Sequence, residues 1–313
     1  MKQIGLLLIL FIGFTTQGFS QLMAWKKTRW AVYGGLGAAN FMGELGGSNQ
    51  IGSDFIRDFE ISMTRPAFNA GIKYFLLERL SIQGAFSYGW LRGDDRKTKE
   101  QHRNNRNLQF RSPILEYSSR LQYNINYEKQ GHRYDLRKVR GRWGNKVIFD
   151  IFAGISFFYF NPRGKDLRQG GTGKWYSLRP IGTEGQNFTK TRKPYSLLQI
   201  SFPMGIVVNY IINSRWSINY EFGIRKTFTD YIDDVSKTYV NIDDVASNSK
   251  IKIDPELAKW FADPSISRQK GINNISAEYQ QRGDSFNKDM YMFSFINLQY
   301  KLKTGRNGLP LLY

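Results

Sequence analysis

The stretch "RWSINYEFGIR", residues 215–225, sorts its side chains onto two faces. Apolar and aromatic residues alternate with small, polar or charged ones, and a period of two is typical of an extended strand with one apolar face. In an ordinary half-buried strand, the polar face meets bulk water. Here that face carries Glu221 and Arg225, so the fold depends on which solvent each face contacts.

Seven other stretches repeat this alternation with varying clarity. Together they predict eight strands, at residues 30–40, 67–76, 80–91, 114–127, 147–160, 196–211, 215–225 and 290–302. Eight is an even number, and each strand is long enough to cross a bilayer at a tilt, which takes about 9–11 residues.

The connections between these strands alternate in length. Only a few residues, around "LLER" and "INSR", join strands two to three and six to seven. Long loops follow strands one, three, five and seven, the longest at about 228–289. Short turns on one rim and long loops on the other are typical of outer-membrane barrels. The exception is residues 128–146, "EKQGHRYDLRKVRGRWGNK", a long connection on the short-turn rim.

Aromatic residues fall at the strand ends. They predict two interfacial girdles, with Trp30, Tyr127 and Trp216 toward the short turns and Trp90 and Tyr159 toward the long loops. A soluble barrel of the lipocalin sort is the alternative, but it would have to enclose the large aromatic residues of nearly every strand. We therefore expect an all-β, eight-stranded antiparallel transmembrane outer-membrane β-barrel with long extracellular loops, apolar face to lipid and polar face to the lumen.

The first twenty residues read as an export signal. Lys2 precedes the apolar run "IGLLLILFIGF", and small residues lead to a cleavage site between Ser20 and Gln21. The run is too short for a membrane-spanning helix, which disfavours a signal anchor. The expected barrel domain is 21–313, located in the outer membrane.

The chain has no cysteine and a formal charge of +19, which becomes +18 once Lys2 is removed with the signal. An exported protein without cysteine has no disulfide framework. Such a basic chain favours anionic partners, and export argues against nucleic acid. We expect outer-membrane lipids, lipopolysaccharide phosphates or an acidic protein partner.

Six charged residues share the inward parity of their predicted strands: Lys73, Glu116, Arg120, Asp150, Glu221 and Arg225. An unpaired charge inside a narrow barrel is costly, so these groups are expected to pair. They form either a plug of salt bridges, or an ion path or catalytic acid pair. Eight strands leave room for little more than their own side chains, which favours the plug. Arg225 or Arg120 is the expected partner of Glu221.

Catalytic motifs are weak. The histidines, His102 and His132, lie in connections on opposite rims, and "GGLGAAN" (34–40) lacks the helix and acidic residue of a dinucleotide site. Its glycines predict close backbone approach or bending. We expect no enzyme activity, no cofactor and no metal. An acidic group in the longest loop admits a calcium site or, preferably, a solvated loop: Asp230, Asp233, Asp234, Asp243 and Asp244. Residues 254–264, "DPELAKWFADP", predict a short helix capped by Asp254 that folds over the barrel mouth.

Five segments are more specific than the barrel pattern. They are "FMGELGG" (41–47), "FRSPILEYS" (110–118), "FAGISFFYFNP" (152–162), "GKWYSLRPIGTEGQ" (173–186) and "RKTFTDYIDDVSKTYV" (225–240). The chain resembles, over almost its whole expected mature length, the PorG-type barrel proteins of Bacteroidetes. That family is an outer-membrane component of the type IX secretion system, the machine for protein secretion that is linked to gliding motility. One departure is Met290, where the family tends toward tryptophan.

The resemblance implies a non-catalytic scaffold that ties the outer membrane to a periplasmic ring made of a lipoprotein and its partner. On the periplasmic rim, the connection 128–146 carries seven Lys or Arg and two acidic residues, a net charge of +5. It is either a solvated basic loop or a docking arm for the ring, whose contact residues would be Arg137, Lys138, Arg140, Arg142 and Trp143. A small outer-membrane channel or ligand-binding barrel, unrelated to secretion, is the alternative function.

Overall fold

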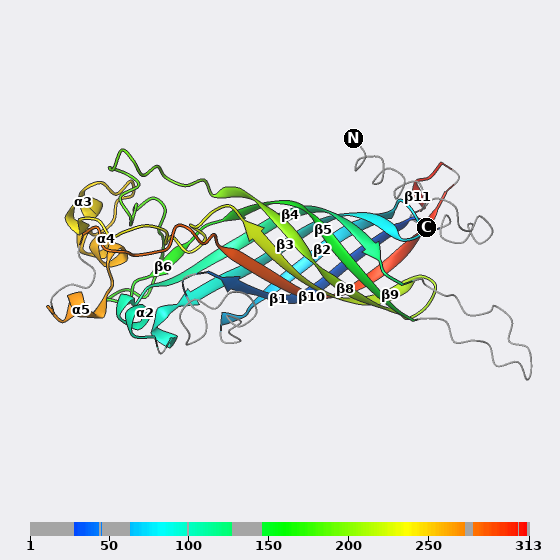
Figure 1. Ribbon diagram of the computed structural model, residues 1–313, viewed down its shortest axis with the longest axis horizontal. Coiled ribbons are helices and arrows are strands. Elements are labelled where there is room, and N and C mark those ends of the chain that lie inside the picture. Colours follow the sequence, from blue (N-terminus) through cyan, green and yellow to red (C-terminus); the bar gives the residue numbers. More distant parts are fainter. Residues whose placement is uncertain are drawn as a thin grey trace, which may run out of the picture.

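The computed structural model describes residues 28–43, 45, 63–98, 100–126, 146–272, 278–305 and 307–311. These residues contain one antiparallel barrel (Figure 1). In chain order its long strands are β1 (Trp30–Met42), β2 (Arg65–Phe75), β3 (Leu80–Asp94), β4 (Gln109–Asn124), β5 (Val147–Phe160), β8 (Leu198–Ile211), β9 (Trp216–Thr227) and β10 (Met290–Thr304). Neighbours in this order pair with one another, and β10 pairs back to β1. The predicted eight-stranded antiparallel barrel is confirmed.

The barrel closes where β1 meets β10, with Trp30 opposite Leu302. This seam depends on glycine. A Cβ atom at Gly37 would fall 1.9 Å from the carbonyl oxygen of Ser294, so any side chain there would force the two strands apart. The prediction that glycines within 34–40 mark a close backbone approach is confirmed.

The two rims of the barrel differ as expected. One, the turn rim, has the tight turns 76–79 and 212–215 and the small hairpin from β10 to β11 (Pro310–Leu311). The other, the loop rim, has the connections 95–108, 161–197 and 228–289. Their elements are η4 (Asp95–Lys97), α2 (Gln101–Arg106), β6 (Arg163–Lys165), β7 (Trp175–Ser177), α3 (Ile242–Ser247), α4 (Pro255–Ala262) and α5 (Ile266–Gln269).

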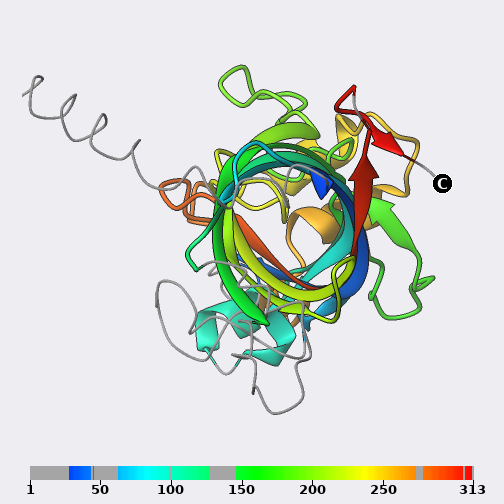
Figure 2. The same cartoon turned by 90° about the vertical axis from the view of Figure 1, so that its right-hand side faces the viewer.

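The helices of the longest loop lie beyond the loop rim. Figure 2, seen from the turn rim, shows the strands as a closed ring with these helices behind it. The helix predicted within 254–264 is α4, and the Asp254 side chain caps it by accepting a hydrogen bond from the backbone N–H of Glu256. Among the described residues, no helix is both long and apolar enough to cross a membrane.

The outer surface of the strands forms an apolar belt. In β9, alternate residues from 216 to 220 are exposed, whereas those from 217 to 225 on the other face are buried. Similar exposed residues on the other strands include Leu36, Phe68, Ile72, Phe86, Leu115, Leu121, Ile151, Ile155, Met204, Ile206, Ile296 and Leu298. A continuous apolar exterior around a closed barrel is the arrangement that contacts lipid. The apolar face of residues 215–225 therefore faces the membrane, and the polar face lines the lumen.

Aromatic residues flank the belt. Ring contacts join Trp30 to Tyr74 and Trp216 to Tyr300 toward the turn rim, and Tyr88 to Trp90 toward the loop rim. Tyr159 is exposed at the loop-rim end of β5. Tyr127 lies outside the described residues. Two girdles of this kind place the membrane boundaries on the barrel.

Candidate functional site in the lumen and its cap

The centre of the lumen holds an ion-pair layer made of Glu116, Arg120, Glu221 and Arg225. β4 supplies the first two residues and β9, three strands away around the ring, supplies the others. Arg120 pairs with Glu221, and Arg225 Nε lies 3.3 Å from the Glu116 carboxylate. Arg225 also lies 3.6 Å from Glu221. All four side chains are buried, so each charge depends on these partners.

Two tyrosines complete this layer. Arg120 donates a hydrogen bond of 3.0 Å to the Tyr33 hydroxyl, and the Tyr291 hydroxyl donates one of 2.7 Å to Glu116. Both tyrosines are buried and lie on the inward parity of β1 and β10. Through these hydrogen bonds, the ion pairs are connected to β1 and β10, the two strands that close the barrel.

An amide layer fills the lumen toward the turn rim. The Asp150 carboxylate accepts hydrogen bonds from Gln122 and from Asn209, the latter at 2.5 Å. Lys73 is buried and attracts the Asp150 carboxylate electrostatically. In the same layer, the Asn297 side chain donates a hydrogen bond of 2.9 Å to the Asn219 side chain. The layer therefore balances one acid against one base within a set of neutral donors and acceptors.

Aromatic rings fill the lumen toward the loop rim. The rings form a contact series from Phe160 through Phe158, Tyr291 and Phe293 to Phe295. The polar face expected toward the lumen is therefore replaced by aromatic side chains in this half. The reason is that the loops close over this end, so apolar side chains are shielded from water on both sides.

The aromatic rings also contact the charges beneath them. The Arg225 guanidinium lies 4.8 Å from the centroid of the Phe293 ring, and Arg120 lies 4.7 Å from that of Phe152. Such cation–π contacts stabilise buried guanidinium groups. Buried side chains occupy all three layers, and ion pairs join four of the six inward charges, namely Glu116, Arg120, Glu221 and Arg225.

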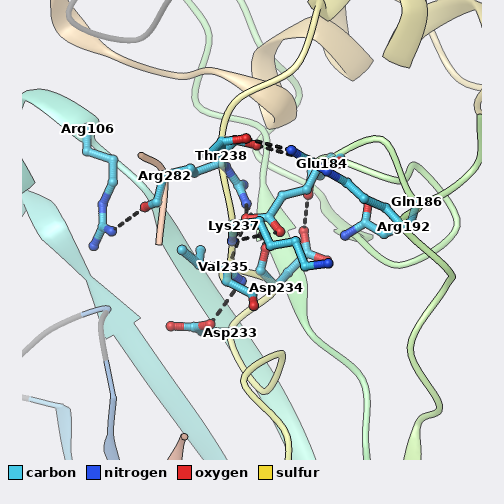
Figure 3. A network of polar contacts seen from close by, with 12 residues as sticks. Arg106, Glu184, Gln186, Arg192, Asp233, Asp234, Val235, Lys237, Thr238 and Arg282 are labelled. Carbon is cyan, nitrogen blue, oxygen red and sulfur yellow. Dashed lines mark hydrogen bonds and ion pairs between the residues drawn. The ribbon is translucent and has the colours of Figure 1, made fainter. Parts of the chain in front are cut away.

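Above the aromatic rings, the long loops form a cap held by a polar network (Figure 3). Glu184 is its centre. Its carboxylate accepts hydrogen bonds from the backbone N–H groups of Ser236 and Lys237, and pairs with Arg282 at 3.0 Å. Arg282 also donates to the carbonyl oxygen of Asp234 at 2.7 Å. Since these residues come from two loops, the network ties the loops together.

Two arginines extend this cap network. Arg192 donates to the carbonyl oxygens of Glu184 and Thr238, at 2.7 and 2.9 Å. Arg106, in α2, donates to the carbonyl oxygen of Arg282 at 2.9 Å, which brings the 95–108 loop into the cap (Figure 3). All three described loops on the loop rim therefore share one set of hydrogen bonds.

Asp234 is an unusual residue in this network. Its φ of 67° lies in the left-handed region, which non-glycine residues rarely adopt. Its buried carboxylate accepts hydrogen bonds from Thr183 at 2.5 Å and Tyr195 at 2.6 Å. Burial raises the pKa of Asp234 to about 6, although the Arg282 charge and these hydrogen bonds act in the opposite direction. The Asp234 carboxyl group can therefore change its charge near pH 6.

The prediction of a solvated acidic loop is wrong for three of its five members. Asp230, Asp233 and Asp234 are buried, because the cap folds them against the barrel mouth. Asp243 and Asp244, in α3, are exposed. Within the described part of the chain, no cluster of His, Cys, Asp or Glu could hold a metal ion.

The five segments 41–47, 110–118, 152–162, 173–186 and 225–240 meet in this region. One core contains Phe41 and Leu45, Phe110 and Ile114, Phe158 and Phe160, and Ile232 and Val235, from four of the segments. The fifth segment joins them through Glu184. Residues of these five segments therefore contribute to one packed unit, the loop-rim half of the lumen and its cap.

Other predicted site residues fall elsewhere. The cleavage site, Ser20 and Gln21, and the expected partner contact, Arg137, Lys138, Arg140, Arg142 and Trp143, lie outside the described residues. His102 is in α2 at the loop rim, and His132 also lies outside. Tyr33 and Tyr291 are not among the predicted site residues, although strand parity places both inside. Glu184 and Arg282 are not among them either, because they lie in loops with no periodic pattern.

No protein-family model matches this chain, and no curated protein matches it in sequence. Among solved structures, it is similar to Neisserial surface protein A, with 6% identity over 88% of this chain and 97% of that chain and a TM-score of 0.39. The Ail protein of Yersinia pestis has 7% identity over 87% and 96%, with a TM-score of 0.35. The outer membrane protein OprG of Pseudomonas aeruginosa has 8% identity over 88% and 96%, with a TM-score of 0.35.

Because these identities and TM-scores are low, the fold is assigned from the strand pairing of this chain itself. A closed ring of eight strands, an apolar exterior and an interior packed with polar and aromatic side chains together define a small β-barrel protein of the outer-membrane class.

Proposed function

We propose that this protein is a non-catalytic structural component of the type IX secretion system, a tether between the outer membrane and a periplasmic ring made of a lipoprotein and its partner. The observation that carries the proposal is the convergence of the five resembling segments. They lie far apart in the sequence, yet they build one continuous core from the lumen to the cap. A chance likeness in segments scattered along the sequence would not explain why those segments contact one another.

The packed lumen supports an anchor rather than a passage. The ion-pair layer, the amide layer and the aromatic rings occupy successive levels of the barrel with buried side chains. An eight-stranded barrel has little interior space beyond its own side chains. The alternative of a small channel predicts a steady current in planar bilayers that disappears when Glu221 and Arg225 are neutralised.

The tether requires a contact on the periplasmic side. β4 ends at Asn124 and β5 begins at Val147, both at the turn rim, so the basic connection between them leaves and re-enters the barrel there. Clustered cations orient a partner and speed association, and a neighbouring tryptophan supplies an anchor that can be buried. We assign this role to the basic group Arg137, Lys138, Arg140 and Arg142 with Trp143.

The test is to reverse the four basic residues to glutamate. The barrel strands are untouched, so heat-modifiable folding should be retained. We expect the variant to detach from the ring in a pull-down and to impair export of type IX cargo. A matched control reverses four exposed lysines in the loops of the other rim, Lys174, Lys190, Lys193 and Lys270, with the same change in charge.

Retention of the ring by the 137–142 variant, with cargo still at the cell surface, would refute this contact. The segment 21–30, "QLMAWKKTRW", would then be the next candidate. Loss of ring binding in both variants would indicate a response to net charge rather than a docking arm.

A further inference from the structure

Three arginines form a row on the outside of the barrel near the loop rim. Arg92 in β3 is directly opposite Arg111 in β4, which in turn is directly opposite Arg163 in β6. Opposed residues on neighbouring strands have Cβ atoms about 4.5–5.5 Å apart, and like charges at this distance repel. We call Arg92, Arg111 and Arg163 the arginine row.

The described part of the chain places little negative charge beside the row. Arg92 pairs with Asp94 at 3.2 Å, but Asp94 also pairs with Arg96 at 2.7 Å. Arg111 lies over the ring of Trp90, 5.7 Å from its centroid. For Arg163, the structure shows no ion pair or hydrogen bond to another described side chain. Among the described residues, the carboxylate paired with the row is that of Asp94, and Arg92 shares it with Arg96.

The row lies at a defined height on the barrel. On β3, the outward residues are apolar or small from Leu80 to Trp90, and the next outward residue is Arg92. Ten residues at about 3.3 Å each, tilted by about 40°, cover roughly 25 Å, the height of the apolar band of such barrels. The arginine row therefore begins where the hydrocarbon ends.

The same height holds on the neighbouring strands. On β4, Leu115 is exposed within the belt and Arg111 is exposed beyond it; on β5, the last exposed belt residue is Tyr159, and Arg163 follows in the same register. Because the strands tilt, opposed residues differ in height by about 3 Å per strand, which an arginine side chain can span. The three guanidinium groups can thus reach one layer of headgroups.

We propose that the arginine row binds the phosphate groups of a glycolipid in the outer leaflet, the lipid A portion of lipopolysaccharide. A guanidinium group offers two parallel N–H donors that match phosphate oxygens, and this geometry suits Arg better than Lys. The acyl chains of the same lipid would cover the apolar belt directly below, including Phe86 and Leu115. This site is independent of the proposed tether, which uses the opposite rim.

The test compares two lipids and two double variants of the purified full-length barrel in detergent, by native mass spectrometry. The lipids are phosphorylated lipid A and the same lipid A after enzymatic removal of its phosphates. The first variant, R111Q/R163Q, removes two charges from the row. The control, K226Q/K288Q, removes two exposed charges at the same rim on β9 and beside β10, across the barrel.

We expect wild type and the control to retain phosphorylated lipid A, and R111Q/R163Q to bind it at least tenfold more weakly. Wild type should bind the dephosphorylated lipid as weakly as R111Q/R163Q binds the phosphorylated one. Equal binding of the two lipids to wild type overturns the proposal, as does an equal loss in both variants. If R111Q/R163Q does not fold, equal binding of the two lipids by wild type still overturns the proposal.

Discussion

Arg120 and Glu221 form an ion pair across the barrel, from β4 to β9, with both side chains buried. Glu116 and Arg225 repeat the contact between the same two strands with the charges exchanged. Each strand carries its acid and its base four residues apart. Because β4 and β9 run in opposite directions, the acid of one strand lies at the height of the base of the other, and the two pairs form successive rungs. These rungs hold opposite walls of the barrel together at mid-height.

The first prediction concerns this ion-pair layer. Replacing Glu221 with alanine leaves Arg120 buried without its main partner, and should lower the free energy of unfolding by about 3–5 kcal/mol. Replacing both residues removes the uncompensated charge and should recover much of that loss. Denaturant unfolding of the barrel in detergent measures both. Equal destabilisation by the single and the double variant would contradict a buried pair.

The second prediction concerns the closing seam. Gly37→Ala places a Cβ atom 1.9 Å from the carbonyl oxygen of Ser294, so β1 and β10 should fail to pair and the heat-modifiable barrel should be lost. Gly84→Ala in β3 is the matched control, because the nearest atom, the Tyr117 hydroxyl oxygen, is 3.7 Å away. Its yield of folded barrel on a gel should match wild type. Normal folding of Gly37→Ala would rule out the tight seam.

The third prediction concerns the cap. Glu184→Gln removes the charge that pairs with buried Arg282, and should loosen the loops while the strands stay intact. A protease added to intact cells should then cut the 228–289 loop several-fold faster. Glu256→Gln is the control, because Glu256 pairs with Lys259 at the surface, where ion pairs contribute little. Equal cleavage rates in the two variants would show that the network does not hold the cap.

The fourth prediction concerns acidity. The pKa of Asp234 is raised to about 6 in the folded cap, so Asp234 binds a proton there at pH values where the unfolded chain has lost it. Its contribution to stability is fully present below about pH 4 and disappears as the pH rises through 6. From pH 4 to 8, the cap of wild type should therefore lose roughly 3 kcal/mol relative to Asp234→Asn.

Hydrogen exchange of backbone amides in 181–186 and 232–238 measures this difference. Asp243→Asn, at an exposed position in α3, should leave the wild-type pH profile unchanged. An Asp234→Asn profile parallel to that of wild type would show that Asp234 stays charged throughout.

The strands could be predicted from the sequence because their two faces meet different solvents. Because of that difference, residues 215–225 alternate between apolar and polar side chains, and the same alternation places Glu221 and Arg225 inside. Parity gives no distance around the ring, however. The choice of Arg120 as the partner of Glu221 depends on β4 and β9 lying across the lumen, which only the assembled barrel defines.

The cap could not be predicted in the same way. Asp233 and Asp234 look like part of a solvated acidic loop, yet both are buried. The Asp234 carbonyl oxygen is bonded by Arg282, 48 residues later in the chain, and its carboxylate by Tyr195, 39 residues earlier. Loop residues follow no repeat, so the long-range donors that make such burial possible leave no local signal.

The seam between β1 and β10 also bears on how the barrel is made. Trp30 pairs with Leu302, so the first strand has no second neighbour until nearly the whole chain has been delivered to the membrane. Until then β1 and the most recently formed strand both present open edges, which attract other chains. Closure through such distant residues is slow. The cell therefore has to protect these edges for most of the protein's assembly, and a product truncated before residue 290 would never lose them.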